Sequence, residues 1–193
     1  MSTTPNDTFP ELVDTMKKAA AALREADVPF LLGGGLAAWA RGGPPTDHDV
    51  DLLVRPQDAE RALTELQKTG MRAERPPEGW LLKAWDGDVM VDVIFRPAGG
   101  PVDDAYFGRA TPLEVAAQPL LVASIDDVLT TKLLAMNEQN PDFRQVLEMA
   151  RSLREQIDWE RVRTQVEGEP FGAAFLTLVE RLRIVPDTVD ARA

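Results

Sequence analysis

Several residue types and patterns are missing from this chain of 193 residues, and each absence excludes a class of site. There is no cysteine, which excludes disulfide bonds, a thiolate zinc site and a cysteine nucleophile. A single histidine cannot form a polyhistidine metal site. No apolar run is long enough to span a bilayer, so no membrane partner is expected. Residues 1–7 are polar and lack the basic and apolar regions of a signal peptide, and we therefore expect a cytoplasmic location.

The chain also lacks a balance of charge, with 32 acidic residues against 21 lysines and arginines. Its net charge of −11 is unfavourable for a broad nucleic-acid-binding surface, because the phosphate backbone is itself negative. A local basic cluster could still guide a phosphate polymer, or it could lie on solvated helix faces with glutamates as ion-pair partners. The candidate cluster consists of Arg144, Arg151, Arg154, Arg161 and Arg163.

The most informative feature that is present is the segment LLGGGLAAWARGGPPTDHDVDLLV, residues 31–54. It predicts a short buried strand, a glycine turn, a helix of small residues, a Pro-Pro loop and a second strand. Side chains alternate along a strand, so Asp49 and Asp51 share one face. Two adjacent carboxylates repel each other and resist burial, and a cation between them is the usual remedy. Oxygen ligands alone suit Mg²⁺ or Mn²⁺.

A third carboxylate, Asp92, lies inside the apolar run VMVDVIF, residues 89–95. A lone carboxylate in such a strand is costly unless it has a partner. That partner could be a basic side chain, an arginine for instance, which would make Asp92 a structural ion. Alternatively, Asp92 joins Asp49 and Asp51 as a third metal ligand. Three carboxylates on neighbouring strands can hold two divalent ions for phosphoryl or nucleotidyl transfer.

Hydrophobic periodicity divides the chain into an α/β half and a helical half. We expect a core at residues 1–122 and a C-terminal helical region at residues 123–193. The predicted strands are 29–32, 50–54, 71–74, 80–85 and 89–95, with an ambiguous segment at 113–122 that could hold a last strand near 119–122. The predicted helices are 11–26, 35–41, 57–68, 125–137, 141–153, 159–166 and 171–184.

In order and spacing these motifs resemble the nucleotidyltransferase superfamily typified by DNA polymerase β. The shared pattern is Gly34-Gly35 after an apolar residue, Asp49-Val50-Asp51 on a strand, and Asp92 on a later strand. The resemblance extends to the small bacterial stand-alone members, including the AbiEii-type toxins. It implies an α/β (α+β) fold, with a mixed β-sheet flanked by helices and followed by a C-terminal helical bundle.

The resemblance also implies site residues and cofactors. Asp49, Asp51 and Asp92 would bind Mg²⁺ or Mn²⁺ and act in catalysis, and Gly34 and Gly35 would bind the NTP co-substrate. In that subgroup a lysine on the first C-terminal helix and an aspartate near the start of the next also contribute. Lys132 and Asp142 occupy the matching positions.

Both of these residues have structural alternatives. Lys132 falls on the apolar face of its predicted helix, where its stem could pack while the amine reaches the rim. Asp142 follows Asn140-Pro141, a good helix start, where a carboxylate complements the helix dipole.

The implied function is transfer of a nucleoside monophosphate from an NTP to an acceptor hydroxyl, with release of pyrophosphate. Similarity to the toxins suggests the tRNA 3′ end as acceptor, and a cognate antitoxin as partner. A small molecule of the aminoglycoside type and a protein side chain are alternative acceptors. A further alternative is a nucleotidyltransferase-like protein that binds a nucleotide or a partner without catalysis.

Two departures and one competing motif qualify this interpretation. Many relatives have an arginine just before the Asp-x-Asp pair, whereas only Arg41 precedes it here. Asp47 creates a second Asp-x-Asp, and its contribution to the metal site stays open. The spacing Gly33-x-Gly35-x-x-Ala38 matches a dinucleotide fingerprint, but a Rossmann acidic residue ends its strand, whereas Asp49 and Asp51 begin theirs.

Overall fold

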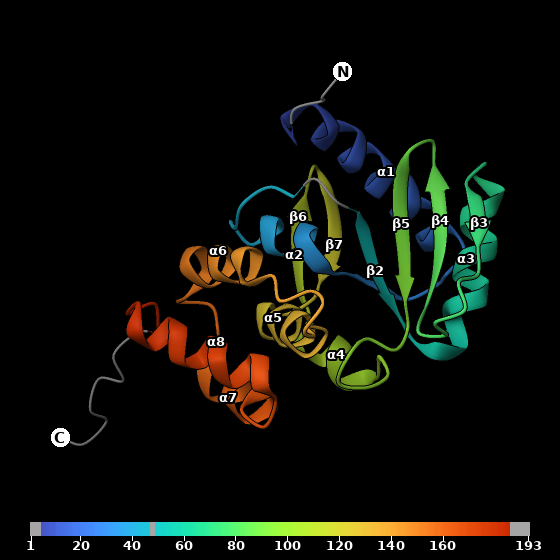
Figure 1. Ribbon diagram of the computed structural model, residues 1–193. Helices are drawn as coiled ribbons and strands as arrows, with labels where there is room; N and C mark the ends of the chain where they lie inside the picture. The colour runs from blue at the N-terminus through green and yellow to red at the C-terminus, as the bar shows by residue number, and fades with distance from the viewer. Residues whose placement is uncertain (1–4, 47–48, 186–193) are drawn as a thin grey trace.

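A single mixed β-sheet organises the computed structural model, which describes residues 5–46 and 49–185. Its strands are β1 (Phe30–Leu32), β2 (Val50–Val54), β3 (Arg72–Glu74), β4 (Leu81–Asp86), β5 (Val89–Ile94), β6 (Thr111–Val115) and β7 (Gln118–Val122). They are ordered β3-β4-β5-β2-β1-β7-β6, with β2·β5 and β1·β7 parallel and the other pairs antiparallel (Figure 1). This confirms the mixed α/β architecture that the sequence predicts.

Helices pack on the sheet, and the helices that follow the last strand in sequence pack on one another. They are α1 (Pro5–Glu25), α2 (Gly34–Ala40), α3 (Ala59–Lys68), α4 (Asp104–Arg109), α5 (Ile125–Leu134), α6 (Phe143–Leu153), α7 (Trp159–Val166) and α8 (Pro170–Arg181). α1 and α3 pack on each other and on the central strands, whereas α5 contacts each of α6, α7 and α8 (Figure 1). No helix in the described ranges is long and apolar enough to cross a membrane.

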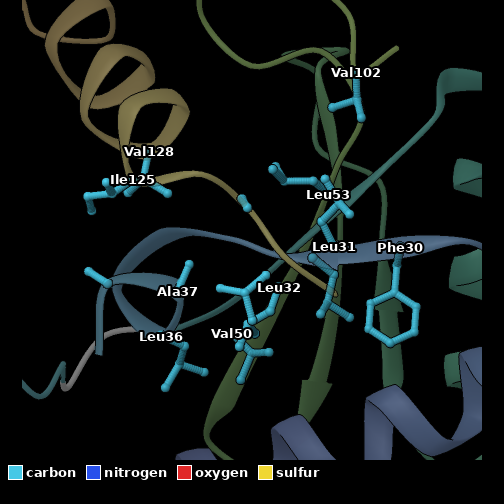
Figure 2. Packing of buried hydrophobic residues seen from close by; sticks show 14 of the residues in the cluster. Phe30, Leu31, Leu32, Leu36, Ala37, Val50, Leu53, Val102, Ile125 and Val128 are labelled. Atoms are coloured by element: carbon cyan, nitrogen blue, oxygen red, sulfur yellow. The ribbon is translucent and has the colours of Figure 1, made fainter. Parts of the chain in front are cut away.

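The core explains why these segments form these elements. The apolar stripe predicted for the first helix is buried, with Leu12, Met16 and Leu23 at most 3% exposed. Leu36 and Ala37 of α2 lie beside the sheet residues Leu32 and Val50, while Ile125 and Val128 bring α5 close (Figure 2). The small side chains of α2 therefore let the glycine segment lie directly against β2 and next to α5.

Some predicted elements need correction. The ambiguous segment at 113–122 is a complete hairpin, β6–β7, whose turn places Ala116 and Ala117 at φ 48° and 62°. Left-handed alanines give no sequence signal for a turn, which is why β6 was not predicted. Helix α4 was also missed. The first C-terminal helix ends at Leu134 rather than 137. The change from strands to helices falls between Val122 and Ile125, whereas a division into two domains remains a prediction.

Candidate active site

Three carboxylates meet where β2 and β5 run side by side. Asp51 and Asp92 are directly paired in the parallel register of these strands, and Asp49 immediately precedes β2. Each of the three offers an oxygen atom, and these oxygens all lie within 4.8 Å of one another. Asp92 is 6% exposed, and Asp49 and Asp51 are half-buried. The structure therefore brings together the three residues that the sequence predicted as metal ligands.

Burial and mutual repulsion perturb these groups. The pKa of Asp51 is raised to about 8, chiefly by burial and then by the Asp49 carboxylate, while Lys132 opposes the increase. Burial also raises the pKa of Asp92, against the opposing charge of Lys83. The buried Oδ1 of Asp92 accepts no hydrogen bond of regular geometry in the described residues, and its one charged neighbour there is the Lys83 ammonium at 3.2 Å. A crowded, all-oxygen set of three carboxylates fits a divalent cation such as Mg²⁺ or Mn²⁺.

The glycine turn makes room for one of these carboxylates. Gly34 has φ +51°, and a Cβ added there would lie 1.5 Å from Oδ2 of Asp51. The backbone N–H of Gly33 donates to the carbonyl of Asp51 at 2.8 Å, so the turn is fixed to β2. At Gly35 the added Cβ would lie 2.5 Å from the Thr46 hydroxyl. Gly34 is thus placed beside Asp51, whereas Gly35 admits the loop that precedes β2.

A pocket with a cavity volume of about 150 Å³ adjoins Asp51. Its walls combine residues of the sheet with α4 and α5, and the Trp80 side chain at its rim is 40% exposed. The lining consists of Gly34, Asp51, Leu53, Trp80, Ile94, Pro97, Tyr106, Asp127, Val128, Thr131, Lys132 and Ala135.

Lys132 and Asp142 belong to the helical half of the chain, in α5 and at the start of α6. Lys132 is half-buried, and its Nζ donates to Oε1 of Gln145 at 2.9 Å. Lys132 lines both the Asp51 pocket and a neighbouring pocket that contains Asp142. Asp142 is the N-cap of α6 and accepts from the backbone N–H of Arg144 at 2.9 Å. The capping role considered for Asp142 is therefore present, while Lys132 stands between the two pockets.

Sequence reasoning missed the lysine beside Asp92. Lys83 faces Asp92 across the antiparallel pair β4·β5, and its Nζ lies 3.2 Å from Asp92 Oδ1. The ion pair considered as an alternative for Asp92 thus exists, with a lysine rather than an arginine. The alternation in β4 places Lys83 on one face, but only the register with β5 reveals its partner.

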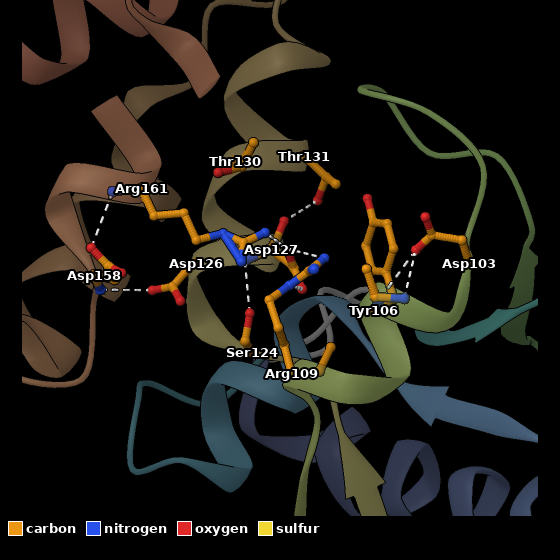
Figure 3. Close-up of polar contacts among 12 residues, drawn as sticks. Asp103, Tyr106, Arg109, Ser124, Asp126, Asp127, Thr130, Thr131, Asp158 and Arg161 are labelled. Atoms are coloured by element: carbon orange, nitrogen blue, oxygen red, sulfur yellow. Dashed lines mark hydrogen bonds and ion pairs between the residues drawn. The ribbon is translucent and has the colours of Figure 1, made fainter. Parts of the chain in front are cut away.

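A second charged cluster joins α4, α5 and α7 (Figure 3). Asp127 is 4% exposed, with Arg109 Nε at 2.9 Å and Arg161 Nη2 at 2.7 Å from its two oxygens. Asp126 accepts from the backbone N–H of Asp158 at 2.8 Å, a second link between α5 and the start of α7. No pattern in the sequence indicates this cluster, because Arg109 lies in no predicted element and Arg161 belongs to the predicted basic cluster.

The predicted basic cluster is largely neutralised. Three of its five members form ion pairs with acidic side chains: Arg154 with Glu155, Arg161 with Asp127 and Arg163 with Glu180. Arg144 and Arg151 are exposed. The Arg154 and Arg163 pairs correspond to the alternative of solvated helix faces with glutamate partners, whereas Arg161 pairs with the buried Asp127.

Two other sequence features remain, Arg41 and the second Asp-x-Asp motif. Arg41, the arginine before the Asp-x-Asp pair, donates to the backbone carbonyls of Ala123 and Val122 at 2.9 and 3.1 Å. It thereby ties the end of α2 to the end of β7. Asp47 and His48 lie outside the described residues, so the second Asp-x-Asp is not tested.

Comparison with known proteins gives a fold but no close relative. No protein-family model and no curated protein matches the chain. Among solved structures, the antibiotic-resistance factor ANT(2'')-Ia matches with a TM-score of 0.63 and 18% identity, over 91% of this chain and 96% of that one. A crystal structure of ANT(2'')-Ia in complex with adenylyl-2''-tobramycin gives 0.59 and 19%, over 86% and 97%.

Two further proteins match more loosely. TM1012, a candidate nucleotidyltransferase from Thermotoga maritima, has a TM-score of 0.52 and 17% identity, over 64% of this chain and 84% of that one. The lincosamide antibiotic adenylyltransferase LnuA, lincomycin-bound, has a TM-score of 0.51 and 10% identity, over 79% and 97%. The chain has a nucleotidyltransferase-type fold. Its three carboxylates lie where β2 and β5 run side by side.

Proposed function

We propose that this protein is a metal-dependent nucleotidyltransferase, which moves a nucleoside monophosphate from an NTP to an acceptor hydroxyl and releases pyrophosphate. The observation that carries the proposal is the set of three carboxylate oxygens within 4.8 Å of one another, on neighbouring strands of this fold. Keeping three such groups together is unfavourable without compensating positive charge, and the single ammonium of Lys83 beside Asp92 offsets only part of it. A protein that only bound a nucleotide or a partner would have no need of this arrangement.

Each site residue has a role that follows from its position. Asp49, Asp51 and Asp92 would hold one or two Mg²⁺ or Mn²⁺ ions, which supply positive charge to the phosphates and the leaving pyrophosphate. Gly34 leaves Asp51 free to project toward the pocket. Lys132, on the pocket wall, would add positive charge beside the phosphates.

The reaction balances as a single displacement. The acceptor oxygen attacks the α-phosphorus, and the bond to the bridging oxygen breaks as pyrophosphate leaves. The hydroxyl proton passes to a carboxylate, for which Asp92 is the candidate, or to solvent. Residues that hold the reactants in line account for the rate by position and electrostatics.

For the acceptor we propose a small molecule. ANT(2'')-Ia has been crystallised with adenylyl-2''-tobramycin, and LnuA is a lincosamide adenylyltransferase. Other proteins with this fold therefore act on small-molecule acceptors. The pocket beside Asp51 is lined mainly by apolar side chains together with the charged Asp51, Asp127 and Lys132, a composition typical of small-molecule sites. The negative net charge and the neutralised arginines oppose a long phosphate polymer.

The tRNA 3′ end, a cognate antitoxin and a protein acceptor stay predictions from the motif resemblance. Exposed Arg144 and Arg151 are the members of the basic cluster left for RNA. We place the reaction in the cytoplasm, where nucleoside triphosphates are abundant.

A label-transfer assay tests the proposal. The protein is incubated with each α-labelled NTP, Mg²⁺ or Mn²⁺, and either a panel of aminoglycosides and lincosamides or total tRNA. The test variant is Asp49→Asn/Asp51→Asn. The matched control is Asp88→Asn, which removes an exposed carboxylate from the turn of the same hairpin as Asp92.

We expect label on a small molecule with the wild type and with Asp88→Asn, and none with the double variant. Label on tRNA instead would replace the proposed acceptor by RNA and favour the toxin interpretation. Nucleotide binding that is indifferent to metal, with transfer to nothing in either panel, would favour the non-catalytic alternative.

A further inference from the structure

A straight row of charged residues crosses four strands of the sheet. Asp51 is paired with Asp92, Asp92 with Lys83, and Lys83 with Glu74 in the registers of β2·β5, β5·β4 and β4·β3. Residues directly opposite each other project from the same face and are close neighbours. Lys83 is therefore the positive member of a row that is otherwise negative, and it lies next to the candidate metal ligands.

The side chain of Lys83 forms an ion pair with Asp92. Its Nζ lies 3.2 Å from Asp92 Oδ1 and 2.9 Å from the sulfur of Met90, and its side chain is 22% exposed. Within the described ranges Asp92 is its only ion-pair partner. Glu74 on its other side is engaged elsewhere, accepting from Trp85 Nε1 at 2.9 Å. Lys83 thus supplies a positive charge to the carboxylates and not to the rest of the row.

This placement has two consequences for a divalent cation. Lys83 neutralises part of the negative charge that would attract the ion, and it is held against an oxygen of one of the three ligands. At the short separations involved, an extra positive charge repels a divalent ion appreciably even in a high dielectric. The protein without metal therefore already contains a cation at its carboxylate cluster.

We propose that Lys83 is an internal counter-ion of the carboxylate cluster, which stabilises the metal-free site and weakens divalent-cation binding until nucleotide arrives. The proposal rests on the metal site of the proposed function. A triphosphate brings several negative charges and its own oxygen ligands, which favour the divalent ion over the lysine. Metal and nucleotide binding are then coupled, each strengthening the other by the same factor.

Mn²⁺ binding in the absence of nucleotide tests this proposal, measured from the electron paramagnetic resonance signal of the free ion. The test variant is Lys83→Met, which keeps the length of the side chain and removes its charge; Lys83→Gln is a second variant with the same expectation. Lys83→Arg keeps the charge. Lys18→Met is the matched control, because Lys18 pairs with Asp86 of the same hairpin at 2.7 Å. Thermal melts establish that each variant is folded.

We expect Lys83→Met and Lys83→Gln to bind Mn²⁺ roughly tenfold more tightly than the wild type or better. Lys83→Arg and Lys18→Met should stay within about threefold of the wild type. If the neutral variants bind Mn²⁺ equally or more weakly while the wild type does bind it, the counter-ion role is overturned and the proposed function stands. If neither the wild type nor the variants bind Mn²⁺, even with a non-hydrolysable NTP analogue, the metal site fails and the inference fails with it.

Discussion

The closest fit in the site is between Gly34 and Asp51, and it yields the sharpest prediction. Replacing Gly34 by alanine puts a methyl group 1.5 Å from Oδ2 of Asp51, where contacts shorter than 3.0 Å are essentially never observed. Gly34 also has φ +51°, a left-handed conformation that disfavours any residue with a Cβ. The substitution therefore strains the turn and pushes a candidate metal ligand out of place.

The two effects have different magnitudes. The backbone strain costs roughly 1–2 kcal/mol of folding free energy. The collision requires the carboxylate or the turn to move by about 1.5 Å, the difference between 3.0 and 1.5 Å. A displacement of about 1 Å in a catalytic geometry can cost roughly 100-fold in rate. We therefore expect Gly34→Ala to lose at least about 100-fold in kcat/KM, or about 2.7 kcal/mol of transition-state stabilisation.

A matched glycine separates the two effects. Gly87, in the turn of the β4–β5 hairpin, has φ +62°, and an added Cβ would meet nothing within 4 Å. Gly87→Ala should lower the thermal midpoint through backbone strain alone and leave nucleotidyl transfer nearly unchanged. Label transfer and thermal melts on both variants provide the comparison. Full turnover by Gly34→Ala, at wild-type Mg²⁺ dependence, would refute the assignment of Asp51 to the metal site.

Three further predictions concern charged groups. Because the folded-state pKa of Asp51 is raised to about 8, the folded protein holds a proton that the unfolded chain loses near pH 4. The free energy of unfolding of the metal-free protein should therefore fall as pH rises from 5 to 8, by at least about 2 kcal/mol more than that of Asp51→Asn. Urea titrations of both proteins at each pH measure this difference, and equal pH profiles would contradict it. Asp127→Asn, which leaves Arg109 and Arg161 without their shared carboxylate, should cost about 3 kcal/mol in the same titrations, and a loss below 1 kcal/mol would show the cluster to be dispensable. Lys132→Met should raise KM for the NTP about tenfold or more in steady-state kinetics, whereas an unchanged KM and kcat would leave this lysine with a structural role only.

The sequence was sufficient where local patterns decide the structure. Alternation of side chains placed Asp49 and Asp51 on one face of a strand, and β2 has the predicted bounds Val50–Val54. The strands predicted at 80–85 and 89–95 correspond to β4 and β5, which the tight turn at Gly87-Asp88 joins into a hairpin, and apolar periodicity gave α7 at Trp159–Val166. Each of these depends on residues a few positions apart, which is the range over which sequence patterns carry information.

The sequence was insufficient where partners come from distant segments. The pairing of Lys83 with Asp92 depends on the register of two strands, and that of Asp127 with Arg109 and Arg161 depends on how three helices pack. An arginine at a distance of 34 positions from its carboxylate looks like any other surface residue in the sequence. Without knowledge of such pairs, the arginines of the basic cluster look free to bind a phosphate polymer, whereas three of the five are ion-paired.

The pocket shows that the predicted boundary at residue 122 does not delimit the site. Gly34, Asp51 and Trp80 form part of its wall from the sheet half, and Val128 and Lys132 of α5 form another part. Lys132 also opposes the rise in the pKa of Asp51, so a charge from the helical half acts on a carboxylate of the sheet half. A fragment that ends at residue 122 would lack both this charge and one side of the pocket. If the proposed function is correct, nucleotide binding therefore requires the two halves together, and the helical half is part of the site rather than an appendage to it.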